Sequence, residues 1–155
     1  GTTVKPDKYD SALLYGLEAG KYRLALKTPK DQIINIEYTR DKSKKKAAYK
    51  KSKAINLKSD IDSIYTSTEK AARWYKASVS STKKRKAVTL SKDSVGGGFK
   101  FCVYQKGKRL KTVKVTKNDK VKTVKLPKKK GAYYVKVTKL TSKTTGAYYL
   151  GTYTY

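Results

Sequence analysis

The chain has 155 residues, enough for one domain that could bury roughly two-thirds of its unfolded surface. Because it has no histidine and a single cysteine, it excludes an intrachain disulfide, the usual zinc sites and any Ser-His-Asp or Cys-His catalytic arrangement. Its 39 basic and 11 acidic residues give a net charge of +28, and no apolar run approaches the roughly 18 residues of a membrane span. The chain begins at Gly1 rather than at methionine, so we expect a trimmed chain without its targeting segment.

Two strands are predicted in the first 45 residues. Apolar and polar residues alternate at 22–26, and a second apolar stretch at 33–38 follows a turn signal. We expect a β-hairpin that is either an extension packed on the main domain or the remnant of a preceding repeat. The side chains expected to pack are Leu24, Leu26, Ile34 and Ile36. The predicted organisation is therefore a hairpin over 1–45 and a main domain over 46–155, with a basic linker or solvated loop at 40–53.

Short stretches with period-two alternation fill the rest of the chain. One places Tyr75, Ala77 and Val79 on a single face, and the clearest alternates Phe99, Phe101 and Val103 with polar or smaller residues. Strands are expected at 55–57, 61–65, 74–79, 88–90, 99–104, 110–115 and 121–126, with two more in 131–155. A tight hairpin loop is predicted at Lys106-Gly107-Lys108, and a closing hairpin through the polar run 141–145. This pattern, without a convincing amphipathic helix, predicts an all-β fold, an antiparallel β-sandwich.

Three segments resemble the bacterial pre-peptidase C-terminal (PPC) domain. They are Ser52-Lys53-Ala54-Ile55-Asn56-Leu57 followed by Ile61, then Ala72-Arg73-Trp74-Tyr75-Lys76-Ala77-Ser78-Val79, and finally Gly131-Ala132-Tyr133-Tyr134-Val135-Lys136-Val137 with Gly146-Ala147-Tyr148-Tyr149-Leu150. The resemblance implies an extracellular β-sandwich with jelly-roll-like topology, carried by a longer secreted or surface protein of a bacterium. The chain departs from the family at Ala72-Arg73, where an aspartate is common. Some relatives bind calcium through acidic linkers, but the matching region 42–53 is basic here, so we expect no metal and no cofactor.

Lysine runs in predicted loops are the first candidate site. Only five of the 39 basic residues are arginines. Lysine's hydrated point charge suits a diffuse contact with a polyanion better than the recognition of nucleic-acid bases. The alternative is a solvated face that opposes aggregation. The candidate polyanion-binding residues are Lys44, Lys45, Lys46, Lys83, Lys84, Arg85, Lys128, Lys129 and Lys130. Because the loops of a sandwich cluster at two ends, several of these runs are expected at the same end.

Tyrosines on the closing strands form the second candidate site. Alternation must send some of them outward, and Tyr134, Tyr149 and Tyr153 are the candidates for an aromatic platform that takes a glycan or an extended peptide. The competing interpretation is core packing and cross-strand aromatic pairing. No catalytic residue is nominated, and Cys102, within an alternating strand, is expected to be inert.

The function predicted from these observations is that of a non-enzymatic extracellular module. It would serve adhesion or targeting to an anionic cell-envelope polymer, a glycan or a protein substrate. One alternative is a structural spacer without a ligand. The other is a nucleic-acid-binding domain, against which the dominance of lysine and the lack of a recognition helix count.

Overall fold

The structure is a computed structural model that describes residues 47–57, 61–65, 71–92, 97–116, 118–142, 144 and 146–155, with the isolated residues 21, 23–25, 27, 35 and 36. At 61–65 and 147 it describes the backbone only. The elements in order are η1 Lys51–Lys53, β1 Ile55–Asn56, β2 Ile61–Tyr65, β3 Arg73–Val79, β4 Lys86–Lys92, β5 Phe99–Gln105, β6 Lys108–Val115, β7 Val121–Lys125, β8 Gly131–Lys139 and β9 Gly146–Thr154. Each strand predicted after residue 54 is present within a few residues of its expected bounds.

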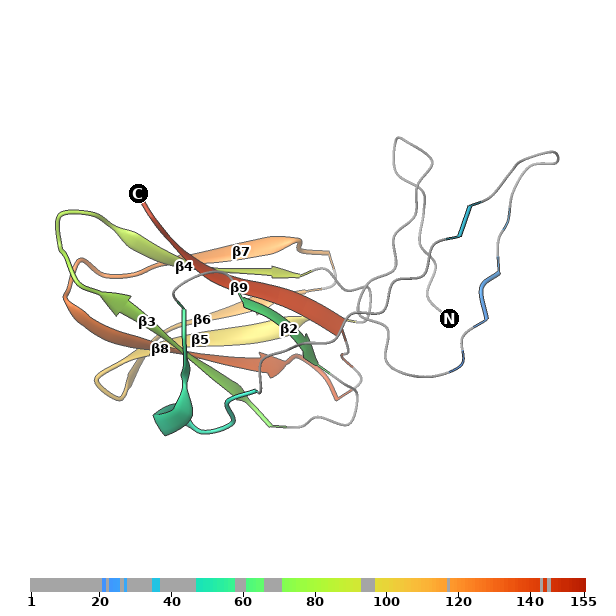
Figure 1. Cartoon of the computed structure of the whole chain (residues 1–155), viewed down its shortest axis with the longest axis horizontal. Coiled ribbons are helices and arrows are strands. Elements are labelled where there is room, and N and C mark those ends of the chain that lie inside the picture. Colours follow the sequence, from blue (N-terminus) through green and yellow to red (C-terminus); the bar gives the residue numbers. More distant parts are fainter. Residues whose placement is uncertain are drawn as a thin grey trace.

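The strands form two facing sheets (Figure 1). One has five strands in the order β1-β3-β8-β5-β6, and the other has four in the order β2-β9-β4-β7. All pairs are antiparallel except β1 with β3. Consecutive strands lie in different sheets except β5 and β6, which form a hairpin. The predicted all-β, antiparallel, jelly-roll-like sandwich is therefore confirmed.

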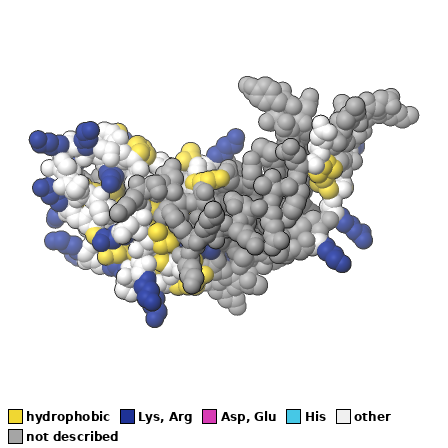
Figure 2. Space-filling model, in the orientation of Figure 1, with side chains coloured by type: hydrophobic (Ala, Val, Ile, Leu, Met, Phe, Trp, Pro, Cys, Tyr) yellow, Lys and Arg dark blue, Asp and Glu magenta, His cyan; other side chains and the backbone are white. Residues whose placement is uncertain are grey.

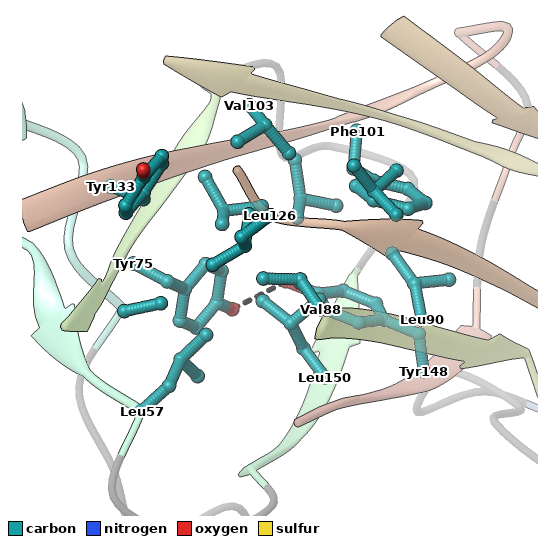
Figure 3. Packing of buried hydrophobic residues seen from close by; sticks show 14 of the residues in the cluster. Leu57, Tyr75, Val88, Leu90, Phe101, Val103, Leu126, Tyr133, Tyr148 and Leu150 are labelled. Carbon is teal, nitrogen blue, oxygen red and sulfur yellow. Dashed lines mark hydrogen bonds between the residues drawn. The ribbon is translucent and has the colours of Figure 1, made fainter. Parts of the chain in front are cut away.

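The core lies between the sheets and consists of the inward residues of the alternating strands (Figure 3). On β3, Tyr75, Ala77 and Val79 are buried, and on β5 the same holds for the predicted Phe99, Phe101 and Val103. The opposite sheet contributes the buried side chains Val88, Leu90, Val124, Tyr148 and Leu150. β-Branched and aromatic side chains fit such a pleated, half-buried surface, which is why this sequence forms strands rather than helices.

One tyrosine from each sheet meets inside this core. The hydroxyls of Tyr75 on β3 and Tyr148 on β9 lie 2.5 Å apart and form a hydrogen bond across the interior (Figure 3). Their rings meet edge to face, with centroids 6.5 Å apart. The ring of Phe99 also packs against that of Tyr148, with centroids 4.9 Å apart. The two sheets are therefore joined by a polar contact as well as by apolar packing.

The predicted closing hairpin is wrong in its pairing. Both strands exist, but β8 pairs with β3 and β5 in one sheet, whereas β9 pairs with β2 and β4 in the other. The segment between them crosses from sheet to sheet, and Thr144 is buried within it. Period-two alternation identifies the buried face of a strand but not its partner, so a hairpin and a crossover look alike in sequence.

The predicted tight turn between β5 and β6 is confirmed. Gln105 pairs with Lys108, which leaves Lys106 and Gly107 as a two-residue loop with φ of 48° and 80°. Positive φ at both positions is the type I′ geometry, which matches the right-handed twist of the flanking strands.

The N-terminal hairpin and its boundary at residue 45 lie outside the described residues, apart from a few isolated positions. Of the four side chains expected to pack on the main domain, Leu24 and Ile36 are described, and they are 53% and 65% exposed. Packing by these two side chains is therefore not observed. Lys44, Lys45 and Lys46 also lie outside the described residues.

A basic end as the candidate binding site

Three loops that carry basic residues lie at one end of the sandwich. In the five-stranded sheet, the end of β3 pairs with the start of β8 (Val79 with Gly131), and the end of β5 pairs there too (Gln105 with Tyr133). In the four-stranded sheet, the start of β4 pairs with the end of β7. The loops 80–85, 106–107 and 126–130 therefore meet at this end, which lies on the left in Figure 1.

We call this surface the basic end and define it by the seven cationic side chains of those loops. All are exposed: Lys83, Lys84, Arg85, Lys106, Lys128, Lys129 and Lys130. Figure 2 shows Lys and Arg side chains gathered at the same end of the molecule. Neighbouring strands lie about 4.8 Å apart and packed sheets about 10 Å apart, so the loops are anchored within one to two Debye lengths of each other, about 8 Å each in physiological salt. Their positive potentials therefore add.

The loop 126–130 is fixed by a buried side chain. The hydroxyl of Tyr133, on β8, donates to the carbonyl of Lys129 at 2.9 Å and lies 3.3 Å from that of Pro127. The backbone N–H of Lys129 also donates to the carbonyl of Pro127 at 2.7 Å. Burial raises the pKa of Tyr133 above its ordinary value. The lysines of this loop are thus displayed from an ordered backbone.

The loop 80–85 is fixed from both sides. The ammonium of Lys86 donates to the carbonyl of Ser78 at 2.8 Å, which ties the start of β4 to the end of β3. The backbones of Arg85 and Tyr155 exchange two hydrogen bonds, of 3.0 and 2.9 Å. Lys86 therefore links the two strands that this loop connects. Within the described part of the chain, no hydrogen bond or ion pair occupies the side chains of Lys83, Lys84 or Arg85.

Asp119 is the acidic residue whose side chain the structure describes, and it lies at the opposite end, in the turn between β6 and β7. Its carboxylate contacts Lys122 at 2.7 Å and accepts hydrogen bonds from the backbone N–H and hydroxyl of Thr116. These partners hold the pKa of Asp119 well below its ordinary range, and the contact with Lys122 contributes most. No described Asp or Glu side chain lies at the basic end.

The structure brings together six of the nine residues predicted for polyanion binding, since the other three lie outside the described residues. The six share the end predicted for them and come from two loops, Lys83, Lys84 and Arg85 with Lys128, Lys129 and Lys130. Sequence reasoning missed Lys106. Following the antiparallel direction of each predicted strand from the β5–β6 hairpin would have placed it at this end.

The three tyrosines predicted as one platform are separated. Tyr134 lies on the outer face of the five-stranded sheet, while Tyr149 and Tyr153 lie on the outer face of the four-stranded sheet. A single platform of these three is therefore excluded, for the same reason that the closing hairpin is wrong: β8 and β9 belong to different sheets.

Around Tyr134, the outer face of the five-stranded sheet alternates rings and cations. The ammonium of Lys51 lies 4.7 Å from the centroid of Tyr134, and that of Lys136 lies 5.6 Å from the centroid of Trp74. Trp74 and Tyr104 pack at 5.6 Å. These rings and cations are engaged with one another, so this face is a packed layer rather than an open platform.

Neither a metal cluster nor a membrane-spanning helix occurs in the described residues. They hold no group of three or more Cys, Asp or Glu side chains positioned as metal ligands, and no helix long and apolar enough to cross a membrane. Cys102 is buried and 3.3 Å from the hydroxyl of Thr112.

Comparison with known proteins gives one structural neighbour of interest. No protein-family model matches the sequence, and no curated protein matches it. Among solved structures, the chain is similar to the pre-peptidase C-terminal domain of a collagenase from Bacillus anthracis, with 17% identity and a TM-score of 0.49. The match covers 64% of this chain and 92% of that domain. It agrees with the resemblance seen in the sequence.

Proposed function

We propose that this domain is a non-enzymatic, extracellular binding module that attaches a longer bacterial protein to an anionic polymer of the cell envelope. The basic end makes the contact. The observation that carries the proposal is the convergence of three ordered loops that display seven exposed cations.

Lysine chemistry supports a phosphate-bearing polymer of irregular shape. An ammonium on a flexible stem follows a mobile phosphodiester chain, whereas arginine's planar fork favours fixed, bidentate geometry. Six of the seven side chains at the basic end are lysines. Binding of this kind releases counterions from the polymer, so its affinity falls as salt rises, and it discriminates little between polymer sequences.

The experiment is a salt titration of affinity against three probes: a teichoic-type polyphosphate, duplex DNA and a neutral polysaccharide. The proposal predicts weak binding to the polyphosphate, with a linear fall of log affinity against log salt concentration. Replacing Lys128, Lys129 and Lys130 with glutamine should make that slope shallower by about 2 to 3, the contribution of three phosphate contacts. The free energy of unfolding should stay nearly unchanged because these side chains are exposed.

A matched control separates the site from net charge. Lys100, Lys114 and Lys120 lie at the opposite end, near the start of β5 and the β6–β7 turn, and their replacement by glutamine removes the same charge. The control variant should keep most of the wild-type slope. Equal loss in both triple variants would make the effect one of overall charge and would contradict the proposal. If no polymer binds at low salt, a structural spacer without a ligand remains as the function. Markedly tighter binding to DNA would favour a nucleic-acid-binding domain.

A further inference from the structure

A groove crosses the outer face of the four-stranded sheet. The strand pairing lines up three rows of outward residues across β9, β4 and β7. The middle row is Gly151, Thr89 and Thr123, between a row that starts at Tyr149 and one that starts at Tyr153. On β9, Gly151 lies between the larger Tyr149 and Tyr153, and an open concavity of about 530 Å³ lies over Gly151, Thr89 and Thr123, within the range of roughly 300–1,000 Å³ typical of ligand sites. We call this concavity the tyrosine groove.

Hydroxyl groups form the floor of the tyrosine groove. The side-chain oxygens of Thr89 and Thr123 lie 3.0 Å apart and share a hydrogen bond, and Ser91 lies beside them. Only one of the two threonine hydroxyls donates in that bond, so the pair retains a donor and several lone pairs for a ligand. The mutual bond holds both groups in place before a ligand arrives.

Tyrosine rings form the walls. Tyr149 and Tyr153 are 39% and 46% exposed, and four strand positions between them correspond to about 13 Å. Tyr153 packs against Tyr155 at 5.6 Å, and the ammonium of Lys125 lies 5.6 Å from the centroid of Tyr155. The backbone of Tyr155 is in turn bonded to that of Arg85. The contacts of Tyr155 therefore help to hold the ring of Tyr153 in place.

Among the described residues, the side chains that line the groove are uncharged, although the chain as a whole has a net charge of +28. The lining residues Thr89, Ser91, Thr123, Tyr149, Gly151 and Tyr153 contribute hydroxyl groups, aromatic rings and backbone. A ligand here meets apolar ring faces and hydroxyls without an ion pair. That combination complements a neutral sugar, whose axial C–H groups stack on aromatic rings while its equatorial hydroxyls exchange hydrogen bonds.

From this complementarity of charge and surface chemistry we infer that the tyrosine groove is a second binding site, for a neutral glycan of pyranose units with equatorial hydroxyls. The glycan lies across the strands, over a floor that spans about 10 Å for three strands and so accommodates about a disaccharide. An extended peptide fits less well. It binds sheets by adding to an edge, whereas β9 and β4, which form most of the groove, are paired on both sides. This site is independent of the basic end.

The test is calorimetric titration of the full chain with cellohexaose, chitohexaose and xylohexaose. The proposal predicts binding of at least one of them, with an affinity that is unchanged between low and high salt because no ion pair forms. Tyr149→Ala and Tyr153→Ala should each weaken it about tenfold through loss of ring stacking. Thr89→Val, which keeps the shape of the floor and removes a hydroxyl, should weaken it about fivefold.

Tyr134→Ala is the matched control, since it removes a partly exposed tyrosine from the outer face of the other sheet. It should leave glycan affinity unchanged, and thermal unfolding of every variant reports whether the fold is kept. Failure of the wild type to bind any of the three glycans would overturn the proposal. So would affinity that survives the loss of both tyrosines in a folded variant, or that falls equally with Tyr134→Ala. Loss of binding at high salt would assign any interaction to the basic end instead.

Discussion

The hydrogen bond between Tyr75 and Tyr148 predicts a distinctive pattern of stability changes. The two side chains are 1% and 0% exposed, and their hydroxyls join the two sheets at 2.5 Å. Replacing either residue with phenylalanine removes one hydroxyl and takes from the other its partner across the core. Loss of a partner inside a core costs about 1–3 kcal/mol, whereas replacement of both groups by apolar ones is nearly neutral. Each single variant should therefore lower the free energy of unfolding by about 1–3 kcal/mol, and the double variant by less than the sum.

Urea unfolding monitored through the single tryptophan, Trp74, measures these changes, with circular dichroism as a second probe. The double-mutant cycle should give a coupling energy of about 1–2 kcal/mol at an unchanged m-value. Tyr133→Phe is a useful comparison, because its hydroxyl bonds to loop carbonyls at the basic end rather than to the opposite sheet. Single variants that cost nothing, or losses that simply add, would refute the reasoning, because the bond would then contribute no coupling between the sheets.

Two further predictions concern turns. A Cβ at Gly98 would lie 2.2 Å from the carbonyl oxygen of Val115, so Gly98→Ala should destabilise the fold by about 3 kcal/mol. A Cβ at Gly107 would meet open space, but the residue has a φ of 80°, so Gly107→Ala should cost about 1–2 kcal/mol. Urea unfolding compares the two, and equal losses would contradict the packing argument. The depressed pKa of Asp119 means that its contribution to stability is present above the unfolded-state pKa of about 3.9 and is lost as pH falls further. Asp119→Asn should therefore flatten the acid limb of the stability profile, and an unchanged limb would show that these contacts do not form in solution.

Much of the fold could be predicted because alternation is a local property. The strands β3, β5 and β8 show their buried faces directly in sequence, and the structure confirms the inward residues of β3 and β5. The tight turn at Gly107 could be predicted for the same reason, because it depends on residues adjacent in the sequence. Partner choice is not local. The stretch 131–155 has the same pattern whether its strands pair with each other or with strands far away, so the predicted hairpin was wrong.

For the candidate sites too, local features could be predicted from the sequence, whereas features that depend on strand partners could not. The basic end could be predicted in outline because loops of a sandwich gather at two ends and lysine runs mark the loops. The split of Tyr134 from Tyr149 and Tyr153 could not, because alternation says that a side chain points outward without saying from which sheet. The tyrosine groove was hidden for a further reason. Its floor depends on the register that brings Thr89 beside Gly151 and Thr123, and register is set by the whole sheet.

The most direct test of the central claim is to map where an anionic polymer contacts the domain. Amide chemical shifts of the isotopically labelled protein, followed during titration with a teichoic-type polyphosphate, report this residue by residue. The account predicts perturbations concentrated in 80–86, 105–109 and 126–131, reversed by added salt, with little change at 97–98 or 118–120 at the opposite end. Shifts spread evenly over lysines on all faces, or centred on the turn around Asp119, would contradict a binding site at the basic end.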